Sequence, residues 1–120
     1  MVRSIFLVLS DATGPDTDAE FNRWYSEKHI QDVSKVPGVV SATRYRIEKD
    51  VTVLPGVNAD NHGFVAIYEI EAKTTEELEV FAASLRNGID SGAVDISSTL
   101  DFKGVTGSLC VPITDRVTAK

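Results

Sequence analysis

One short stretch of the chain, residues 21–46, contains most of the side chains that could take part in a reaction. In it, His29 follows Tyr25 by four residues and Trp24 by five. Helical geometry places His29 at the edge of the apolar face of a predicted helix, from which its imidazole could reach a pocket. An imidazole has an ordinary pKa of about 6.5 and exchanges a proton near neutral pH. His29 is therefore a candidate general acid or base. The alternative is a histidine that complements the helix dipole or bonds a loop carbonyl.

Two neighbouring side chains could support that role. Asp32 lies three residues after His29, so on a continuing helix its carboxylate could contact the imidazole, fix the tautomer and raise the basicity. The Tyr25 hydroxyl needs a hydrogen-bond partner if it is buried, which predicts a polar pocket nearby. The alternatives are a solvated carboxylate at Asp32 and core packing for Trp24 and Tyr25, because a helix that packs on a sheet needs an apolar stripe.

A second group of candidates lies on predicted strands and at a strand end. Arg44 and Arg46 share one face of the second strand, where a guanidinium could hold a carboxylate or enolate if that face lines a cavity. Tyr45 and Tyr68 occupy positions of opposite parity on neighbouring strands, and the pattern does not decide which one enters the cavity. His62, in a loop rich in glycine and asparagine, is the only other histidine. The candidates for catalysis are thus His29, Asp32 and Tyr25, and those for substrate binding are Trp24, Arg44, Tyr45, Tyr68 and His62.

The elements that must position these side chains follow from hydrophobic patterning. An apolar run rich in β-formers at residues 2–10 predicts the first strand. Thr17 and Glu20 have capping-box spacing and predict the start of the first helix. Because proline cannot continue a helix, Pro37 predicts its end.

The remaining pattern predicts two further strands, a helix and a last strand. Residues 39–49 alternate well enough to predict the second strand. Residues 63–71 predict the third strand, with one apolar face made of Phe64, Ala66, Tyr68 and Ile70. Thr74 and Glu77 form a second capping box ahead of an amphipathic helix. The pair Asn87-Gly88 predicts the end of that helix, and residues 102–113 predict the fourth strand.

The order of these elements is β-α-β-β-α-β, an α+β arrangement of the ferredoxin-like type in one domain spanning residues 1–120. It predicts a four-stranded antiparallel sheet with both helices on one face. The predicted strands are apolar on both sides, so the face without helices would be unfavourable to expose. A second copy of the same sheet is the natural cover, and we predict a homodimer.

The aromatic stretch and the residues after it resemble the EthD-like branch of the dimeric α/β-barrel superfamily. The matching residues are Phe21, Asn22, Arg23, Trp24, Tyr25, His29, Asp32, Val33, Val36, Pro37, Gly38, Arg44 and Tyr45. The resemblance implies the ferredoxin-like fold and a dimer that closes into a barrel. The superfamily includes antibiotic monooxygenases, polyketide cyclases, lactone isomerases, aldoxime dehydratases and haem-degrading enzymes, together with members of no known activity. It therefore implies a fold and leaves the reaction open.

Composition excludes several other classes of protein. Twelve basic against eighteen acidic residues give a net charge of −6, which does not suit nucleic-acid binding. No apolar run approaches the length that spans a bilayer, and no polybasic membrane patch is present. A single cysteine, Cys110, forms no internal disulfide and suits a reducing cytoplasm. Two isolated histidines make a poor metal site, and no phosphate-binding glycine motif occurs, so we predict neither a metal nor a cofactor.

Together these observations predict a small cofactor-free enzyme that acts by proton transfer on a hydrophobic, oxygenated small molecule. The reaction would be an isomerisation, cyclisation, dehydration or cofactor-independent oxygenation, with His29 as base or acid and Tyr25 or an arginine stabilising charge on oxygen. The competing hypothesis is a non-catalytic protein that binds a small ligand or assists an oxygenase system. An enzyme should bring His29 and another polar group to one cavity, whereas a binder should have an apolar cavity with His29 outside it.

Overall fold

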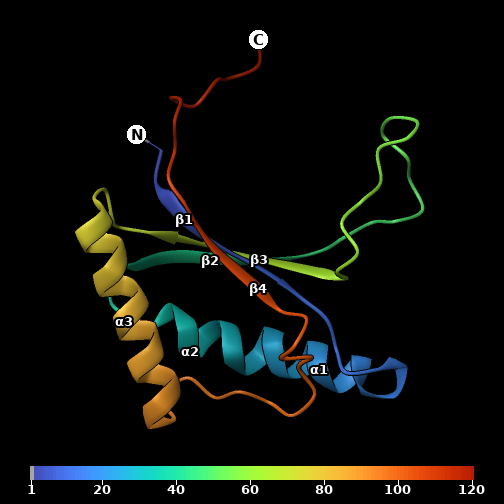
Figure 1. The fold of residues 1–120 in the computed structure, drawn as a ribbon, viewed down its shortest axis with the longest axis horizontal. Helices are drawn as coiled ribbons and strands as arrows, with labels where there is room; N and C mark the ends of the chain where they lie inside the picture. The colour runs from blue at the N-terminus through green and yellow to red at the C-terminus, as the bar shows by residue number, and fades with distance from the viewer. Residues whose placement is uncertain (1) are drawn as a thin grey trace.

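A computed structural model describes residues 2–120 and contains a four-stranded antiparallel sheet with helices on one face (Figure 1). The strands, in chain order, are β1 (Ser4–Ser10), β2 (Val39–Arg46), β3 (Phe64–Ile70) and β4 (Thr106–Cys110). Within the sheet they follow the order β2-β3-β1-β4, and all three pairs are antiparallel. This is the ferredoxin-like topology, and the predicted fold class is confirmed.

The helical layer consists of a long composite helix followed by a single regular one. The composite helix contains, in order, a 3₁₀ turn η1 (Pro15–Thr17), α1 (Asp18–Trp24), a π-helical turn η2 (Tyr25–His29) and α2 (Ile30–Ser34). The second helix, α3 (Thr75–Ser91), begins with the predicted capping box, in which the Thr74 hydroxyl accepts from the Glu77 amide. None of the helices within residues 2–120 is long and apolar enough to cross a membrane.

The π-helical turn explains why the apolar pattern of the first helix is irregular. Phe21, Tyr25, His29 and Val33 follow one another at intervals of four residues, and all four are buried. In a regular α-helix, three such steps rotate the side chain by about 120° around the axis. A π-turn accommodates one additional residue, equivalent to about 100°, and so removes most of that drift. The turn therefore keeps all four side chains against the sheet.

The first helix begins where predicted, with Thr17 as the N-cap of α1, but the predicted capping box and two other predicted element ends are wrong. Thr17 and Glu20 form no capping box, because the Thr17 hydroxyl bonds Gly14 and the Glu20 carboxylate pairs with Arg23. The second helix continues through Asn87-Gly88 and ends at Gly92, which adopts φ 84°.

Gly88 serves close packing rather than helix termination. A Cβ atom there would lie 2.9 Å from a methyl group of Val94, so only glycine allows the chain to return this closely over the helix.

The fourth strand is shorter than predicted and spans only Thr106–Cys110. The residues before it form a turn in which the Gly104 and Val105 amides both bond Asp101.

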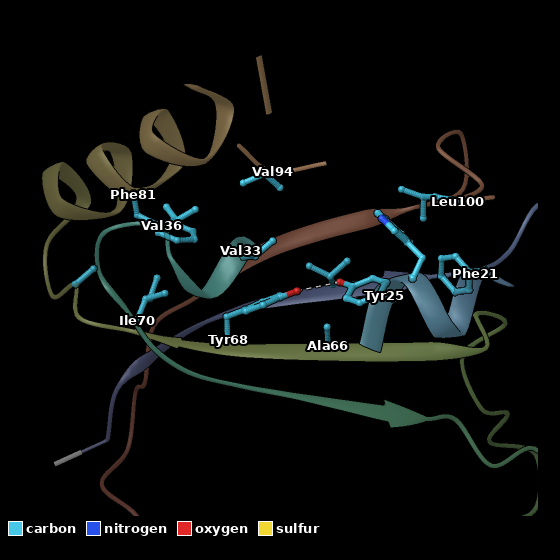
Figure 2. Packing of buried hydrophobic residues seen from close by; sticks show 13 residues of the cluster. Phe21, Tyr25, Val33, Val36, Ala66, Tyr68, Ile70, Phe81, Val94 and Leu100 are labelled. Carbon is cyan, nitrogen blue, oxygen red and sulfur yellow. Dashed lines mark hydrogen bonds between the residues drawn. The ribbon is translucent and has the colours of Figure 1, made fainter. Parts of the chain in front are cut away.

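The core lies between the helices and the sheet (Figure 2). Its sheet side contains Ala66, Tyr68 and Ile70, as the alternation in the third strand predicts. The opposite face carries the side chains of alternate parity, which are only partly buried: Ile5, Leu7, Leu9, Val65 and Ile67. In the view of Figure 1, the β2–β3 connection and the C-terminal segment both extend on the side of the sheet away from the helices.

Candidate active site

A cavity of about 210 Å³ lies between the helical layer and the sheet. The composite helix contributes Tyr25 and His29 to its wall, and strand β3 contributes Tyr68. Apolar residues from the strands, from α2, from α3 and from the α3–β4 connection line most of the remainder: Phe6, Val8, Val33, Leu85, Ile89, Ile96, Leu100, Phe102 and Val105. The cavity is therefore an apolar space whose wall includes one imidazole and two phenol rings.

His29 is held in this wall by aromatic contacts that the π-helical turn creates. Its ring centroid lies 4.6 Å from that of Trp24 and 4.7 Å from that of Tyr25. Trp24 and His29 are five residues apart, which would place them about 140° apart on a regular α-helix. The π-turn brings these two rings together, and π-turns of this kind occur frequently at functional sites.

One hydrogen bond determines which ring nitrogen of His29 is free. His29 Nδ1 lies 3.0 Å from the carbonyl oxygen of Asp95. A carbonyl oxygen only accepts, so Nδ1 carries the hydrogen and donates, which leaves Nε2 as the acceptor in the neutral ring. Burial lowers the pKa of His29 below its usual value and outweighs the opposing effects of the Asp95 carbonyl and the nearby carboxylates. At neutral pH the ring is therefore uncharged and able to accept a proton.

Asp95 is a site residue that the sequence did not reveal. Besides accepting from His29, it accepts from the indole of Trp24, with 3.2 Å between Nε1 and Oδ2. Its own amide donates to Asp32 Oδ2 over 3.3 Å. Asp95 thus ties three positions of the composite helix to the α3–β4 connection, across more than sixty residues of sequence.

The expected contact between Asp32 and the His29 imidazole is replaced by an indirect one. The Asp32 carboxylate forms an ion pair with Lys28 at 3.0 Å and accepts from the Asp95 amide. These two bonds lower the pKa of Asp32 although partial burial opposes them. Asp32 therefore supports the residue that orients His29, while the Asp95 carbonyl occupies the place predicted for the carboxylate.

Two tyrosine hydroxyls meet beside the cavity. Figure 2 shows the hydroxyls of Tyr25 and Tyr68 pointing toward each other between helix and sheet, with 3.1 Å between the oxygens. The side chains are almost inaccessible, at 2% and 0% exposure respectively. Burial raises the pKa of both phenols, so both stay protonated and can donate hydrogen bonds.

Arg44 stands behind Tyr25 and outside the cavity wall. Its guanidinium carbon lies 4.4 Å from the centre of the Tyr25 ring, and its Nη atoms donate to the Ser26 hydroxyl at 2.8 Å and the Asn22 side-chain oxygen at 2.9 Å. Arg44 therefore fastens strand β2 to helix α1 and places a positive charge next to the Tyr25 ring. Arg44 does not line this cavity, and its role in substrate binding stays a prediction.

The other two candidates lie away from the cavity. Tyr45 is 52% exposed and projects from the face of the sheet opposite the helices, since its neighbour Arg44 faces the helices. His62 is held between Asp60 and the carbonyl of Gly104 and is not part of the cavity wall. The structure thus brings together Trp24, Tyr25, His29 and Tyr68, and their roles in a reaction stay predictions.

A larger hollow of about 1020 Å³, about as open to solvent as the cavity, lies beside the C-terminal segment. Its walls are residues 2–4, 70–73 and 111–115 together with Glu77, and they contain no histidine and no aromatic side chain. Within residues 2–120, no group of three or more histidine, cysteine or acidic side chains is arranged to hold a metal ion. The smaller cavity is therefore the place where acid–base groups and an apolar pocket coincide.

Comparison of the whole fold with solved structures agrees with this topology. A monooxygenase from the gene ActVA-Orf6 of Streptomyces coelicolor, solved in complex with nanaomycin D, superposes with a TM-score of 0.52 over 98% of this chain and 94% of its own, at 13% identity. The chain therefore has the ferredoxin-like fold that this solved structure also has. At this level of identity the likeness concerns the fold and not the activity.

Two further structures are similar over most of the chain. A Shewanella loihica PV-4 protein provisionally named a monooxygenase has a TM-score of 0.48 at 12% identity, covering 98% of this chain and 99% of its own. An ethyl tert-butyl ether D (EthD) family protein from Bacillus halodurans C-125 has a TM-score of 0.42 at 15% identity, covering 88% and 96%. No family model and no curated protein matches the sequence.

Proposed function

We propose that this protein is a small enzyme that catalyses proton transfer on a hydrophobic, oxygenated small molecule bound in the 210 Å³ cavity. One observation supports this most strongly. His29 donates through Nδ1 to the Asp95 carbonyl, so its Nε2 is left as the proton acceptor of the ring, and His29 lines an apolar cavity together with two buried phenols. A base and a hydrogen-bond donor for a developing oxyanion are then available to one ligand.

The proposed step begins with a substrate that carries an acidic hydrogen next to an oxygen-bearing carbon. His29 Nε2 takes up that proton, and the resulting imidazolium is stabilised through Nδ1 by the Asp95 carbonyl. Negative charge develops on the substrate oxygen, where a hydroxyl of the Tyr25–Tyr68 pair donates to it. The guanidinium of Arg44, 4.4 Å from the Tyr25 ring centre, favours negative charge on this side of the cavity.

The anion formed in this way has several outcomes. Return of the proton to another atom gives an isomer, attack on an electrophilic carbon of the same molecule gives a ring, loss of a leaving group gives a dehydrated product, and reaction with dioxygen gives an oxygenated one. A positioned general base contributes about 10²–10⁴-fold, and one oxyanion donor about 10²–10³-fold. The groups in the cavity therefore suffice for a modest rate enhancement on an activated substrate.

The size and lining of the cavity restrict the substrate. An apolar cavity of about 150 Å³ accommodates benzene, so one of 210 Å³ suits one substituted ring or two small fused rings. No charged side chain lines it, which disfavours ligands with a fixed charge. The complex of the Streptomyces coelicolor monooxygenase with nanaomycin D supports binding of a small organic ligand by this fold.

We also propose that the enzyme is a homodimer joined through the open face of the sheet. That face carries five partly buried aliphatic side chains, Ile5, Leu7, Leu9, Val65 and Ile67, and no helix covers it. A second sheet would remove these side chains from water at roughly 25 cal/mol per Å² of apolar surface.

A screen for ligands followed by His29→Gln tests the proposal. Oxygenated aromatic compounds are screened by thermal shift, and compounds that stabilise the protein are incubated with it and analysed by mass spectrometry for a change in structure. Glutamine keeps hydrogen-bonding capacity but cannot take up a proton near neutral pH. We expect His29→Gln to bind the substrate and lose turnover, and the exposed neighbour Glu27→Gln to retain turnover.

A non-catalytic ligand-binding protein is the second candidate, favoured by the largely apolar lining of the cavity. It would bind compounds from the screen without converting any of them. If conversion is found and His29→Gln retains it, His29 only positions the ligand. Either result would contradict the proposed proton transfer.

A further inference from the structure

A second histidine, His62, lies outside the cavity and joins two connections of the fold. It stands on the β2–β3 connection with 19% of its side chain exposed. Its Nδ1 lies 2.6 Å from Oδ1 of Asp60, and its Nε2 lies 2.7 Å from the carbonyl oxygen of Gly104 on the α3–β4 connection. Both distances are those of strong hydrogen bonds.

These two partners define the protonation state that the geometry requires. A carboxylate and a carbonyl oxygen accept hydrogen bonds and do not donate, so each ring nitrogen of His62 must carry a hydrogen. Only the imidazolium has hydrogens on both nitrogens. A neutral ring would satisfy one partner and direct a lone pair at the other. The charge-assisted bond to Asp60, which the amide of His62 reinforces at 2.8 Å, is the stronger one, so the bond to Gly104 is the one lost.

The Gly104 carbonyl belongs to a turn that forms part of the cavity wall, here called the cavity cover. Phe102 and Val105, on either side of Gly104, both line it. The Asp101 carboxylate packs against Gly104, since a Cβ atom there would lie 2.7 Å from it. The Gly104 and Val105 amides donate to Asp101, so their hydrogen exchange with solvent reports whether this turn is closed.

Charged groups from three segments surround His62, and most favour its cationic form. Asp60 lies on its own connection, and Asp11, after β1, accepts from the Gly63 amide at 2.7 Å. Asp101 lies in the same turn as Gly104 and accepts from the Gly104 amide. Lys49 opposes them in charge and bonds the carbonyl of Asn61 at 2.6 Å. The Gly104 carbonyl and Asp60 raise the pKa of His62 above its usual value.

We propose that His62 is a proton-controlled latch on the cavity cover. As an imidazolium it holds the Gly104 carbonyl and keeps the Phe102–Val105 turn against the cavity. When it loses its proton, the bond to Gly104 breaks and the turn opens. The latch itself depends only on this geometry, whereas its control of ligand exchange rests on the proposed function of the cavity.

Histidine NMR and amide exchange test the latch on the intact protein. The chain has two histidines, so the His29→Gln and His62→Gln spectra assign both ring titrations. We expect His62 to titrate above 6.5 and His29 below it. Exchange of the Gly104 and Val105 amides, corrected for the intrinsic effect of pH, should become about tenfold faster as pH rises through the His62 titration.

Two variants separate the latch from a general loosening of the fold. In His62→Gln the exchange of both amides should no longer depend on pH after the same correction, while His29→Gln should retain the dependence. Asp60→Asn should lower the His62 titration and move the exchange midpoint by the same amount. A His62 titration at or below 6.5, or pH-dependent exchange that persists in His62→Gln, would overturn the latch.

Release of 1-naphthol from the protein, followed by stopped-flow fluorescence, tests whether the latch controls the cavity. Release should accelerate with the His62 titration and lose that dependence in His62→Gln. Release that does not vary with pH would overturn this control. If 1-naphthol does not bind at any pH while the two amides still follow His62, the latch stands and the proposed ligand cavity fails.

Discussion

Removing the hydrogen bond between Tyr25 and Tyr68 should lower the unfolding free energy, and the structure indicates by how much. Replacing either residue with phenylalanine removes one hydroxyl and leaves the other buried, at 0–2% side-chain exposure, without its partner. An unsatisfied buried group costs about 1–3 kcal/mol. The separation of 3.1 Å is slightly long for a bond between two hydroxyls, so we expect the lower half of that range, about 1–2 kcal/mol, for each single variant.

The double variant distinguishes a true pair from two independent losses. With both hydroxyls replaced, no polar group is left unsatisfied, and the unfolding free energy should return most of the way to that of the wild type. Urea denaturation at one fixed protein concentration measures the wild type, the two single variants and the double variant. Single variants as stable as the wild type, or losses that simply add, would show that the two hydroxyls do not depend on each other.

Two further predictions concern pH and assembly. Because burial lowers the pKa of His29 in the folded protein, the unfolded chain binds the proton more readily once pH falls below about 6.5. We expect the unfolding free energy in urea to decrease as pH drops from 6.5 through the folded pKa and this decrease to shrink in His29→Gln; an identical pH profile in the variant would contradict the assigned burial. For assembly, light scattering at micromolar concentration should give about twice the chain mass of 13.0 kDa, and a clean monomer would refute the sheet-to-sheet dimer.

The sequence predicted those parts of the fold that depend on local patterns. Alternation in residues 63–71 identified the face of β3 that enters the core, and the capping box at Thr74 and Glu77 marked the start of α3. The end of α3 was misplaced because Gly88 serves a contact with Val94, which no pattern along the helix reveals. Local signals thus gave the order of the elements, and tertiary packing determined their ends.

The candidate site was predictable in its helix but not in the contacts that complete it. The spacing of Tyr25 and His29 indicated a shared face, whereas the π-turn that aligns His29 with Trp24 left only an irregular apolar pattern as its trace. Asp95 bonds His29 across 66 positions and comes from a polar stretch without a motif. Strand β2 has an irregularity between Val39 and Ser41, so alternation alone did not decide which of its faces meets the helices.

The most direct test of the proposed site is a crystal structure of the protein with the most strongly stabilising compound from the ligand screen. The proposed function predicts that the compound lies in the cavity between the composite helix and the sheet. A hydroxyl or a carbon that bears an acidic hydrogen should lie within hydrogen-bonding or proton-transfer distance of His29 Nε2, about 2.6–3.2 Å for a hydroxyl oxygen. Its oxygen should also approach a hydroxyl of the Tyr25–Tyr68 pair. A compound bound in the hollow beside the C-terminal segment, or in the cavity with no polar atom near His29, would contradict the proposal.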